Sequence, residues 1–198
     1  MRGRRIGVFG GTFDPVHVGH LVAAVNARHA LDLDVVLLVV ASVPWQKEGS
    51  RPLTSAADRL AVVRAAVGDV DGVEASDVEL RRGGPSYTAD TLVTLAVAEP
   101  DAELFVVLGA DAAAGLDTWE RVDEVRRAAR LVVVTRPGSP VPHLGSWAFD
   151  VVEVPGLEVS STDLRERVGD GRPLDYLVPA GAMDEIRRRG LYGSVGGG

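Results

Sequence analysis

Five runs of aliphatic residues punctuate the chain, and within them apolar residues do not alternate with polar ones. A continuous apolar run is typical of a strand that is buried on both faces, as in a parallel sheet. The runs predict strands at residues 6–9, 35–40, 104–108, 131–134 and 151–154.

Between these runs, apolar residues recur at i, i+3, i+4 and i+7, the spacing of an amphipathic helix. The pattern predicts helices that begin near residues 18, 56, 88, 120 and 179. Thr54 and Ser55 are candidate N-caps of the second helix. The last is predicted to run from Pro179 to residue 189, with Gly190 just past its end.

Strands that alternate with helices predict an α/β fold, a doubly wound parallel sheet with flanking helices. We expect a single domain over residues 1–198, with a surface loop at 138–145 and a flexible tail at 194–198. In such a sheet, ligands bind beyond the carboxyl ends of the strands. Residues 10–11, 41–47 and 109–111 are predicted to lie there.

Composition narrows the class of protein. No apolar run approaches the ~20 residues of a membrane span, and no signal-peptide core follows the first arginines, so we expect a cytoplasmic protein without a membrane partner. The chain has no cysteine, which excludes thiolate catalysis and disulfides. A net charge of −7 argues against nucleic-acid binding, so an anionic substrate would need a local basic pocket.

The string GGTFDPVHVGH, residues 10–20, carries the strongest chemical signal. Gly10 and Gly11 lack Cβ atoms, so in this glycine loop (residues 10–17) backbone N–H groups can approach a phosphate closely. His17 and His20 straddle the start of the next helix, one turn apart on one face. Two imidazoles there can donate hydrogen bonds to phosphate and stabilise charge on a leaving group.

Two other interpretations of the histidines remain. A pair at i, i+3 can bind zinc, although the sequence offers no evident third ligand, and the loop can be a structural turn with incidental histidines. The chain contains no Walker sequence, no GxGxxG after a strand and no GxSxG elbow.

The SSTDLR segment, residues 160–165, predicts a second phosphate cradle. Ser161 and Thr162 offer hydroxyl and N-terminal N–H groups at a helix start, and Arg165 follows one turn later. Ordinary helix capping is the alternative interpretation of the same residues.

The middle of the chain holds candidates for recognising an acceptor. The GGPSYT turn, residues 83–88, leads into a helix and presents Tyr87 and Thr88. Asp111 follows a predicted strand, where a carboxylate suits ribose hydroxyls or a metal. Trp119 can stack on a flat heteroaromatic ring, or simply pack in the protein.

GGTFDPVHVGH resembles the GGTFDPxHxGH signature of bacterial nicotinate-nucleotide adenylyltransferases, within the HxGH nucleotidyltransferase superfamily. Further segments resemble that family in the same order along the chain. They are GGPSYTADTL at 83–92, LGAD at 108–111 with Trp119, SSTDLR at 160–165 and YLVP at 176–179. The resemblance covers roughly residues 5–192.

This resemblance implies a Rossmann-like fold and transfer of AMP from ATP to nicotinate mononucleotide, with Mg²⁺ held mainly by the ATP phosphates. No side chain is implied as a metal ligand. The implied ATP-binding residues are Gly10, Gly11, Thr12, Phe13, His17, His20, Ser161, Thr162 and Arg165. The implied acceptor-binding residues are Tyr87, Thr88, Asp111 and Trp119, and the implied catalytic residues are His17, His20, Lys47 and Arg165.

One loop departs from the family pattern. Many members carry Pro-His-Lys after the second strand, whereas this chain has Pro44-Trp45-Gln46-Lys47. Lys47, the only lysine in the chain, keeps the ammonium. The alternative functions are a nicotinamide-mononucleotide or pantetheine-phosphate adenylyltransferase, and a non-catalytic nucleotide sensor. The sequence does not determine the oligomeric state.

Overall fold

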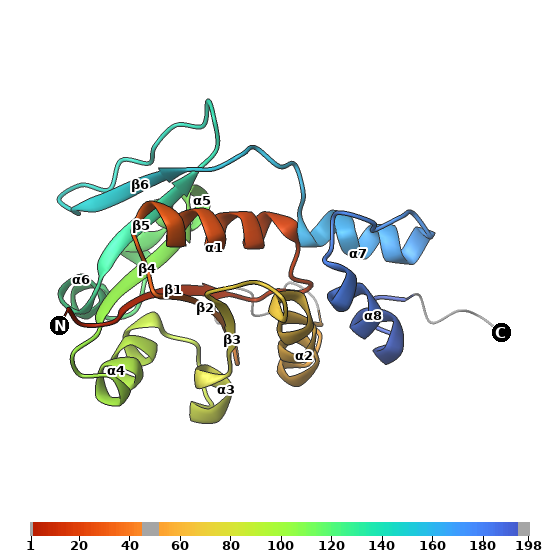
Figure 1. The fold of residues 1–198 in the computed structure, drawn as a ribbon, viewed down its shortest axis with the longest axis horizontal. Coiled ribbons are helices and arrows are strands. Elements are labelled where there is room, and N and C mark those ends of the chain that lie inside the picture. Colours follow the sequence, from red (N-terminus) through yellow and green to blue (C-terminus); the bar gives the residue numbers. More distant parts are fainter. Residues whose placement is uncertain (1, 45–51, 194–198) are drawn as a thin grey trace.

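The computed structural model describes residues 2–44 and 52–193, which contain a six-stranded parallel sheet. Its strand order is β3-β2-β1-β4-β5-β6 (Figure 1). The strands are β1 (Arg5–Gly11), β2 (Val35–Val40), β3 (Val73–Ser76), β4 (Glu103–Gly109), β5 (Arg130–Thr135) and β6 (Phe149–Glu153). The predicted doubly wound α/β fold is confirmed.

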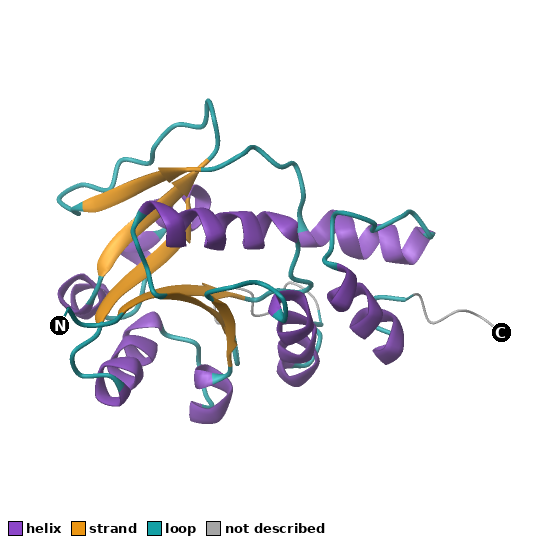
Figure 2. Cartoon of the chain, viewed as in Figure 1, coloured by secondary structure: helices purple, strands orange, loops and turns teal. Residues whose placement is uncertain are grey.

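Helices cover both faces of this sheet (Figures 1 and 2). One core cluster packs under α1 (Val18–Ala30), α2 (Ala56–Val67), α7 (Ser161–Asp170) and α8 (Ala180–Arg189). The opposite cluster packs under α3 (Val78–Arg82), α4 (Thr88–Ala98), α5 (Ala110–Ala114), the 3₁₀ turn η2 (Leu116–Thr118) and α6 (Val122–Ala128). Burial of apolar side chains on both sides explains why the strands read as continuous aliphatic runs.

The aliphatic runs predicted five of the six strands, with small differences at their ends. The run at 151–154 extends past its strand, since β6 covers Phe149–Glu153 and Val154 lies outside it. The short strand β3 has the sequence VEAS and only one buried residue, so it carries no aliphatic run to recognise. The helix expected near residue 120 begins at Val122.

The order of the strands reverses direction between β1 and β4, which pair in parallel with Val8 opposite Val106. Such a switch point opens a crevice beyond the carboxyl ends of the strands. In Figure 1, α7 and α8 lie past the end of the sheet at which β1 leads into α1. Elements from both halves of the chain therefore meet at this edge.

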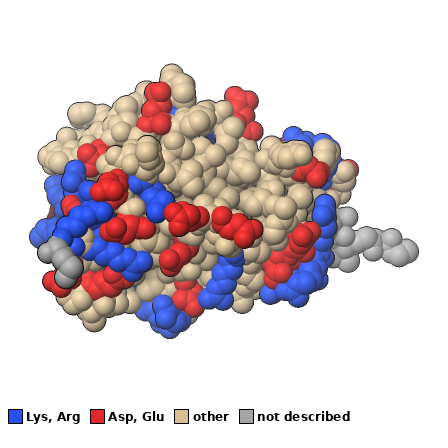
Figure 3. Space-filling model, viewed as in Figure 1, with Lys and Arg blue, Asp and Glu red and all other residues tan. Residues whose placement is uncertain are grey.

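The surface drawn in Figure 3 carries charged side chains of both signs. On the face drawn in Figure 3, acidic and basic side chains are interspersed, without a continuous basic stripe. The connection from β5 to β6 contains the predicted loop at 138–145, which Figure 2 draws without helix or strand. Across residues 2–44 and 52–193, no helix has both the length and the apolar character needed to span a bilayer.

Candidate active site

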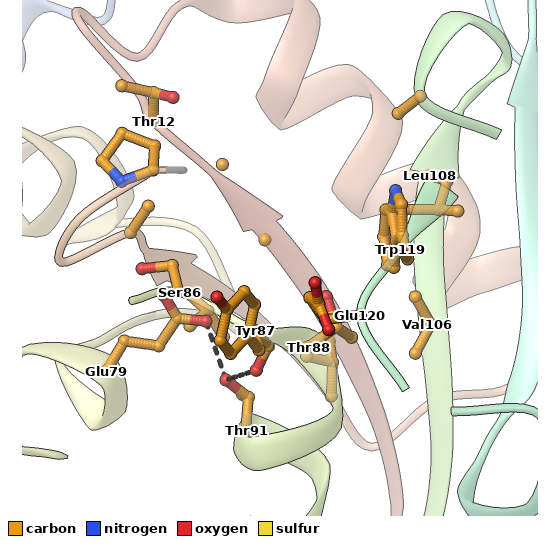
Figure 4. A pocket seen from close by; sticks show the side chains of 17 residues that line it. Thr12, Glu79, Ser86, Tyr87, Thr88, Thr91, Val106, Leu108, Trp119 and Glu120 are labelled. Atoms are coloured by element: carbon orange, nitrogen blue, oxygen red, sulfur yellow. Dashed lines mark hydrogen bonds between the residues drawn. The ribbon is translucent and has the colours of Figure 1, made fainter. Parts of the chain in front are cut away.

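A cavity opens at the carboxyl edge of the sheet, where β1, β2 and β4 end (Figure 4). Gly10, Gly11 and Thr12 line it from the glycine loop, and Leu108 lines it from β4. Its other described lining residues include Ala41 and Pro44 after β2, the GGPSYT turn from Ser86 to Thr88, and Trp119 with Glu120. The glycine loop, the segment after β2 and the GGPSYT turn thus surround one space, whereas none of the predicted residues 109–111 is among its described lining residues.

The two glycines of the glycine loop have different local environments. A Cβ added at Gly10 would meet no atom within 4 Å, so the backbone there faces open space. A Cβ at Gly11 would lie 2.7 Å from the Phe13 ring, which packs directly over that position. The Phe13 side chain is only 2% exposed and also contacts the His20 ring edge-to-face, with centroids 5.0 Å apart. Phe13 therefore supports the loop and His20 from within the core.

His17 and His20 stack on each other, with ring centroids 3.7 Å apart and an interplanar angle of 28°. The backbone N–H of His17 donates to Nδ1 of His20 over 3.2 Å. A nitrogen that accepts a hydrogen bond carries no proton, so the neutral His20 ring holds its proton on Nε2. The hydrogen bond from the loop backbone therefore leaves Nε2 as the nitrogen through which His20 can donate.

His17 is the more buried of the two histidines, with 8% of its surface exposed. Burial, and secondarily the positive charge of Arg136, lowers the pKa of His17 from 6.5 to about 4. His17 is thus neutral at pH 7, which also removes the repulsion that two stacked imidazolium rings would have. Neutral imidazoles act as hydrogen-bond donors toward an anion and do not require a net charge.

The SSTDLR segment contacts the glycine loop directly. The Ser161 hydroxyl donates to the carbonyl of Pro15 over 2.8 Å, and Arg165 donates to the carbonyl of Asp14 over 2.7 Å. A second Arg165 nitrogen bonds the Thr162 hydroxyl at 3.0 Å. The predicted pairing of the two segments is therefore observed, and it places a guanidinium and the N-terminus of α7 beside the loop.

Three of the four acceptor candidates, Tyr87, Thr88 and Trp119, line the cavity. Figure 4 shows Trp119 beside Leu108, across the pocket from Tyr87. Trp119 is partly exposed and also packs against the second core cluster. Tyr87 precedes the first turn of α4, and Thr88 is its first residue, so the positive end of that helix lies at the cavity wall.

A hydrogen-bond network that is buried at Thr91 and Glu79 and reaches the surface at Arg82 holds the GGPSYT turn. The Thr91 hydroxyl donates to Glu79 over 2.7 Å, and Arg82 donates to Thr91 at 3.3 Å and to the carbonyl of Pro85 at 3.0 Å. Gly83 and Gly84 have φ of +71° and +74°, a backbone region that favours glycine. The network therefore holds Tyr87 and Thr88, the last two residues of the turn, at the cavity.

Known proteins are similar in sequence to this chain over almost its full length. A family model described as cytidylyltransferase-like matches residues 8–167. Curated proteins from Saccharopolyspora erythraea and Leifsonia xyli subsp. xyli, both named "Probable nicotinate-nucleotide adenylyltransferase", are 44% and 45% identical to it. Each alignment covers 96% of this chain, and 91% and 95% of the respective relative. The chain belongs to the nicotinate-nucleotide adenylyltransferase family.

A solved structure supports the fold of this adenylyltransferase family member. Plasmodium falciparum nicotinic acid mononucleotide adenylyltransferase, complexed with NaAD, superposes with a TM-score of 0.78. The match covers 96% of this chain and 97% of that one at 17% identity. At that identity the likeness concerns the arrangement of the elements.

Several residues implied by the adenylyltransferase resemblance are not among the described lining residues of the cavity; on the ATP side these are Phe13, His17, His20, Ser161, Thr162 and Arg165. Asp111 is exposed in the first turn of α5 and is not among the described lining residues, whereas its neighbour Ala112 is. Its acceptor role stays a prediction. Lys47, with Trp45 and Gln46, lies outside the described residues, and only Pro44 of that loop is placed at the cavity.

The structure adds residues that the sequence analysis did not select. Arg136 follows β5 directly, and its charge acts on His17; its place after a buried strand was the available signal. Tyr192 donates its hydroxyl to the buried Asp14 carboxylate over 2.8 Å, which ties the end of the described chain to the glycine loop. No local pattern indicates that contact.

The zinc interpretation of the histidine pair finds no further ligands. Within the described parts of the chain, no three His, Cys, Asp or Glu side chains are grouped so that they could hold a metal ion. His17 also uses its backbone, and His20 its Nδ1, within the loop itself. The two rings are stacked, and His17 is the more buried of them.

Proposed function

We propose that this protein transfers AMP from ATP to nicotinate mononucleotide, forming deamido-NAD and pyrophosphate in NAD biosynthesis. The proposal rests on which segments lie together at the carboxyl edge of the sheet. The stacked histidines and the SSTDLR segment meet at the glycine loop, and the cavity beside it is lined by Tyr87, Thr88 and Trp119. The full-length relatives named for this activity support the same assignment.

The chemistry requires positioning and charge stabilisation, without a covalent enzyme intermediate. The 5′-phosphate of the acceptor is already a nucleophile, and it attacks the α-phosphorus of ATP in line as pyrophosphate leaves. In this proposal, His17 and His20 donate to the phosphates from one side. Ser161, Thr162 and Arg165 hold them from the other, and Gly10 lets the backbone approach.

Mg²⁺ is proposed to enter with ATP. It would neutralise phosphate charge when bound. The described residues offer no cluster of three ligands, which fits an ion carried mainly by the phosphates with its own water shell. Arg165 and Arg136 contribute the protein's positive charge at this edge.

Two features have opposite effects on the choice between nicotinate and nicotinamide. The N-terminus of α4 at Thr88 favours the carboxylate of nicotinate. Glu79 and Glu120, which also line the cavity, would repel that carboxylate if they faced it. Glu79 accepts from Thr91 through Oε1 only. We propose that the helix N-terminus outweighs both carboxylates, in keeping with the nicotinate-nucleotide names of the full-length relatives.

Pyrophosphate release measured across a panel of acceptors tests this function. Purified protein receives ATP, Mg²⁺ and one of nicotinate mononucleotide, nicotinamide mononucleotide or phosphopantetheine, and the product is identified by mass. We expect the highest kcat/KM with nicotinate mononucleotide. Equal or better use of the amide, or of phosphopantetheine, contradicts the assignment of the acceptor. No release with any acceptor would indicate the nucleotide sensor.

A further inference from the structure

The largest of the fully buried side chains in the described chain belongs to an arginine. Arg59 lies on α2, is 1% exposed, and sits on the helix face that also buries Val62 and Val63. Burying a guanidinium is costly unless its N–H groups are satisfied. Its hydrogen bonds therefore indicate why this position is charged.

Backbone carbonyls in three separate segments accept hydrogen bonds from this guanidinium, and the longest of these bonds runs from Nη2 to the Ser42 carbonyl over 3.5 Å. Nε donates to Thr54 over 2.9 Å, Nη1 to Thr12 over 2.8 Å, and Nη2 to Ala41 over 2.8 Å. Thr12 belongs to the glycine loop, Ala41 follows β2, and Thr54 precedes α2. The planar fork of arginine can reach carbonyls in three directions, whereas a lysine ammonium cannot reproduce that arrangement.

Arg59 acts where the sheet stops joining β1 to β2. The last backbone contact between these segments is the Ala41 N–H donating to the Gly11 carbonyl over 3.0 Å. The next carbonyls, at Thr12 and Ala41, are joined through the guanidinium. The side chain thus extends the connection between the two segments past the end of the ladder.

The connection continues from β2 to the acceptor side of the cavity. The Ser42 N–H donates to the Ser86 hydroxyl over 2.8 Å, and the Ser86 N–H donates to the Val43 carbonyl over 3.0 Å. Ser86 stands directly before Tyr87 in the GGPSYT turn. A hydrogen-bonded path therefore runs from Thr12, through Arg59 and residues 41–43, to the turn.

We propose that Arg59 is a positioning residue for AMP transfer: it holds the glycine loop and the GGPSYT turn at the separation that in-line attack requires. The inference rests on the proposed function, since it assigns ATP to the glycine loop and the acceptor to the turn. A misplacement of ~1 Å between reacting groups lowers the rate by about 10²-fold. Loss of this spacing therefore lowers kcat more than it raises either KM.

The test compares Arg59→Lys with two control variants. Arg59→Lys should lower kcat by about 10- to 100-fold, with KM for ATP and for the acceptor changing less than about threefold. Arg64→Lys changes an exposed arginine on the same helix, paired with Asp77 at 3.1 Å, and should keep wild-type kinetics. Val63→Ala opens a cavity in the same helix face without touching the carbonyls, and should lower the melting temperature with kcat within about twofold.

The outcomes separate positioning from simple stability. Arg59→Lys with wild-type kcat overturns the inference, as does a kcat loss in Val63→Ala that equals the loss in Arg59→Lys at matched melting temperature. If Arg59→Lys does not fold, Ser86→Ala tests the far end of the path, and an unchanged kcat there overturns the inference. Wild-type protein that releases no pyrophosphate contradicts the proposed function instead.

Discussion

Acidification provides a quantitative test of the environment of His17. Burial and the charge of Arg136 lower the pKa of His17 from 6.5 to about 4. Between these values the unfolded chain binds a proton that the folded protein excludes, so stability is present above pH 6.5 and is lost as the pH falls toward 4. At ~1.4 kcal/mol for each pH unit, the loss is about 3 kcal/mol.

Thermal unfolding of the wild type and His17→Gln at pH 7 and pH 4 measures this loss. The carboxylates titrate in both proteins, so the difference between their two decreases isolates His17. For a chain of this size we expect the wild type to lose about 6–12 °C more than the variant. His29→Gln, which replaces an exposed histidine at the end of α1, should keep the wild-type decrease.

Equal decreases in the wild type and His17→Gln would refute the reasoning. They would mean that His17 gains its proton in the folded protein as readily as in the unfolded chain. The buried arrangement of His17, stacked on His20, would then not describe the protein in solution.

Three further predictions concern single side chains. His20→Ala should lower kcat by about 10²–10³ while the protein stays folded, because one donor to the developing charge is lost; near-full activity would remove His20 from this role. Trp119→Ala should raise KM for the acceptor by about tenfold and leave KM for ATP unchanged, as stacking predicts, whereas equal effects on both would indicate packing alone. Tyr192→Phe should destabilise the fold by about 1–2 kcal/mol, seen as a melting temperature about 2–8 °C lower, since its hydroxyl bonds the buried Asp14 carboxylate; an unchanged melting temperature would show that this contact contributes little.

Periodicity predicted the elements that repeat an apolar pattern over several residues. The run at 35–40 matches β2 in full, and the capping candidate Ser55 does cap α2 through the Asp58 N–H. The strand β3 was missed because a four-residue edge strand with one buried side chain shows no period. The same limit applies to α3 and α5, which are one turn long.

Chemical motifs predicted which segments lie together, but not which contacts their side chains make. GGTFDPVHVGH and SSTDLR were paired as two phosphate cradles, and the structure joins them through Ser161 and Arg165. The acceptor role of Asp111 stays a prediction, because a motif places a residue along the chain without orienting its side chain. A carboxylate just after a strand can point along several directions, and here it is exposed on α5 and is not among the described lining residues.

The sequence by itself determined the class of fold, the family and the segments that carry the chemistry, because these depend on local composition and on spacing along the chain. Only the tertiary structure determined the burial, the protonation and the hydrogen-bond partners of individual side chains. The depressed pKa of His17 comes from burial, and the proton on His20 Nε2 follows from one backbone contact. The role inferred for Arg59 depends on carbonyls up to 47 residues away, a separation at which sequence pattern carries no geometric information.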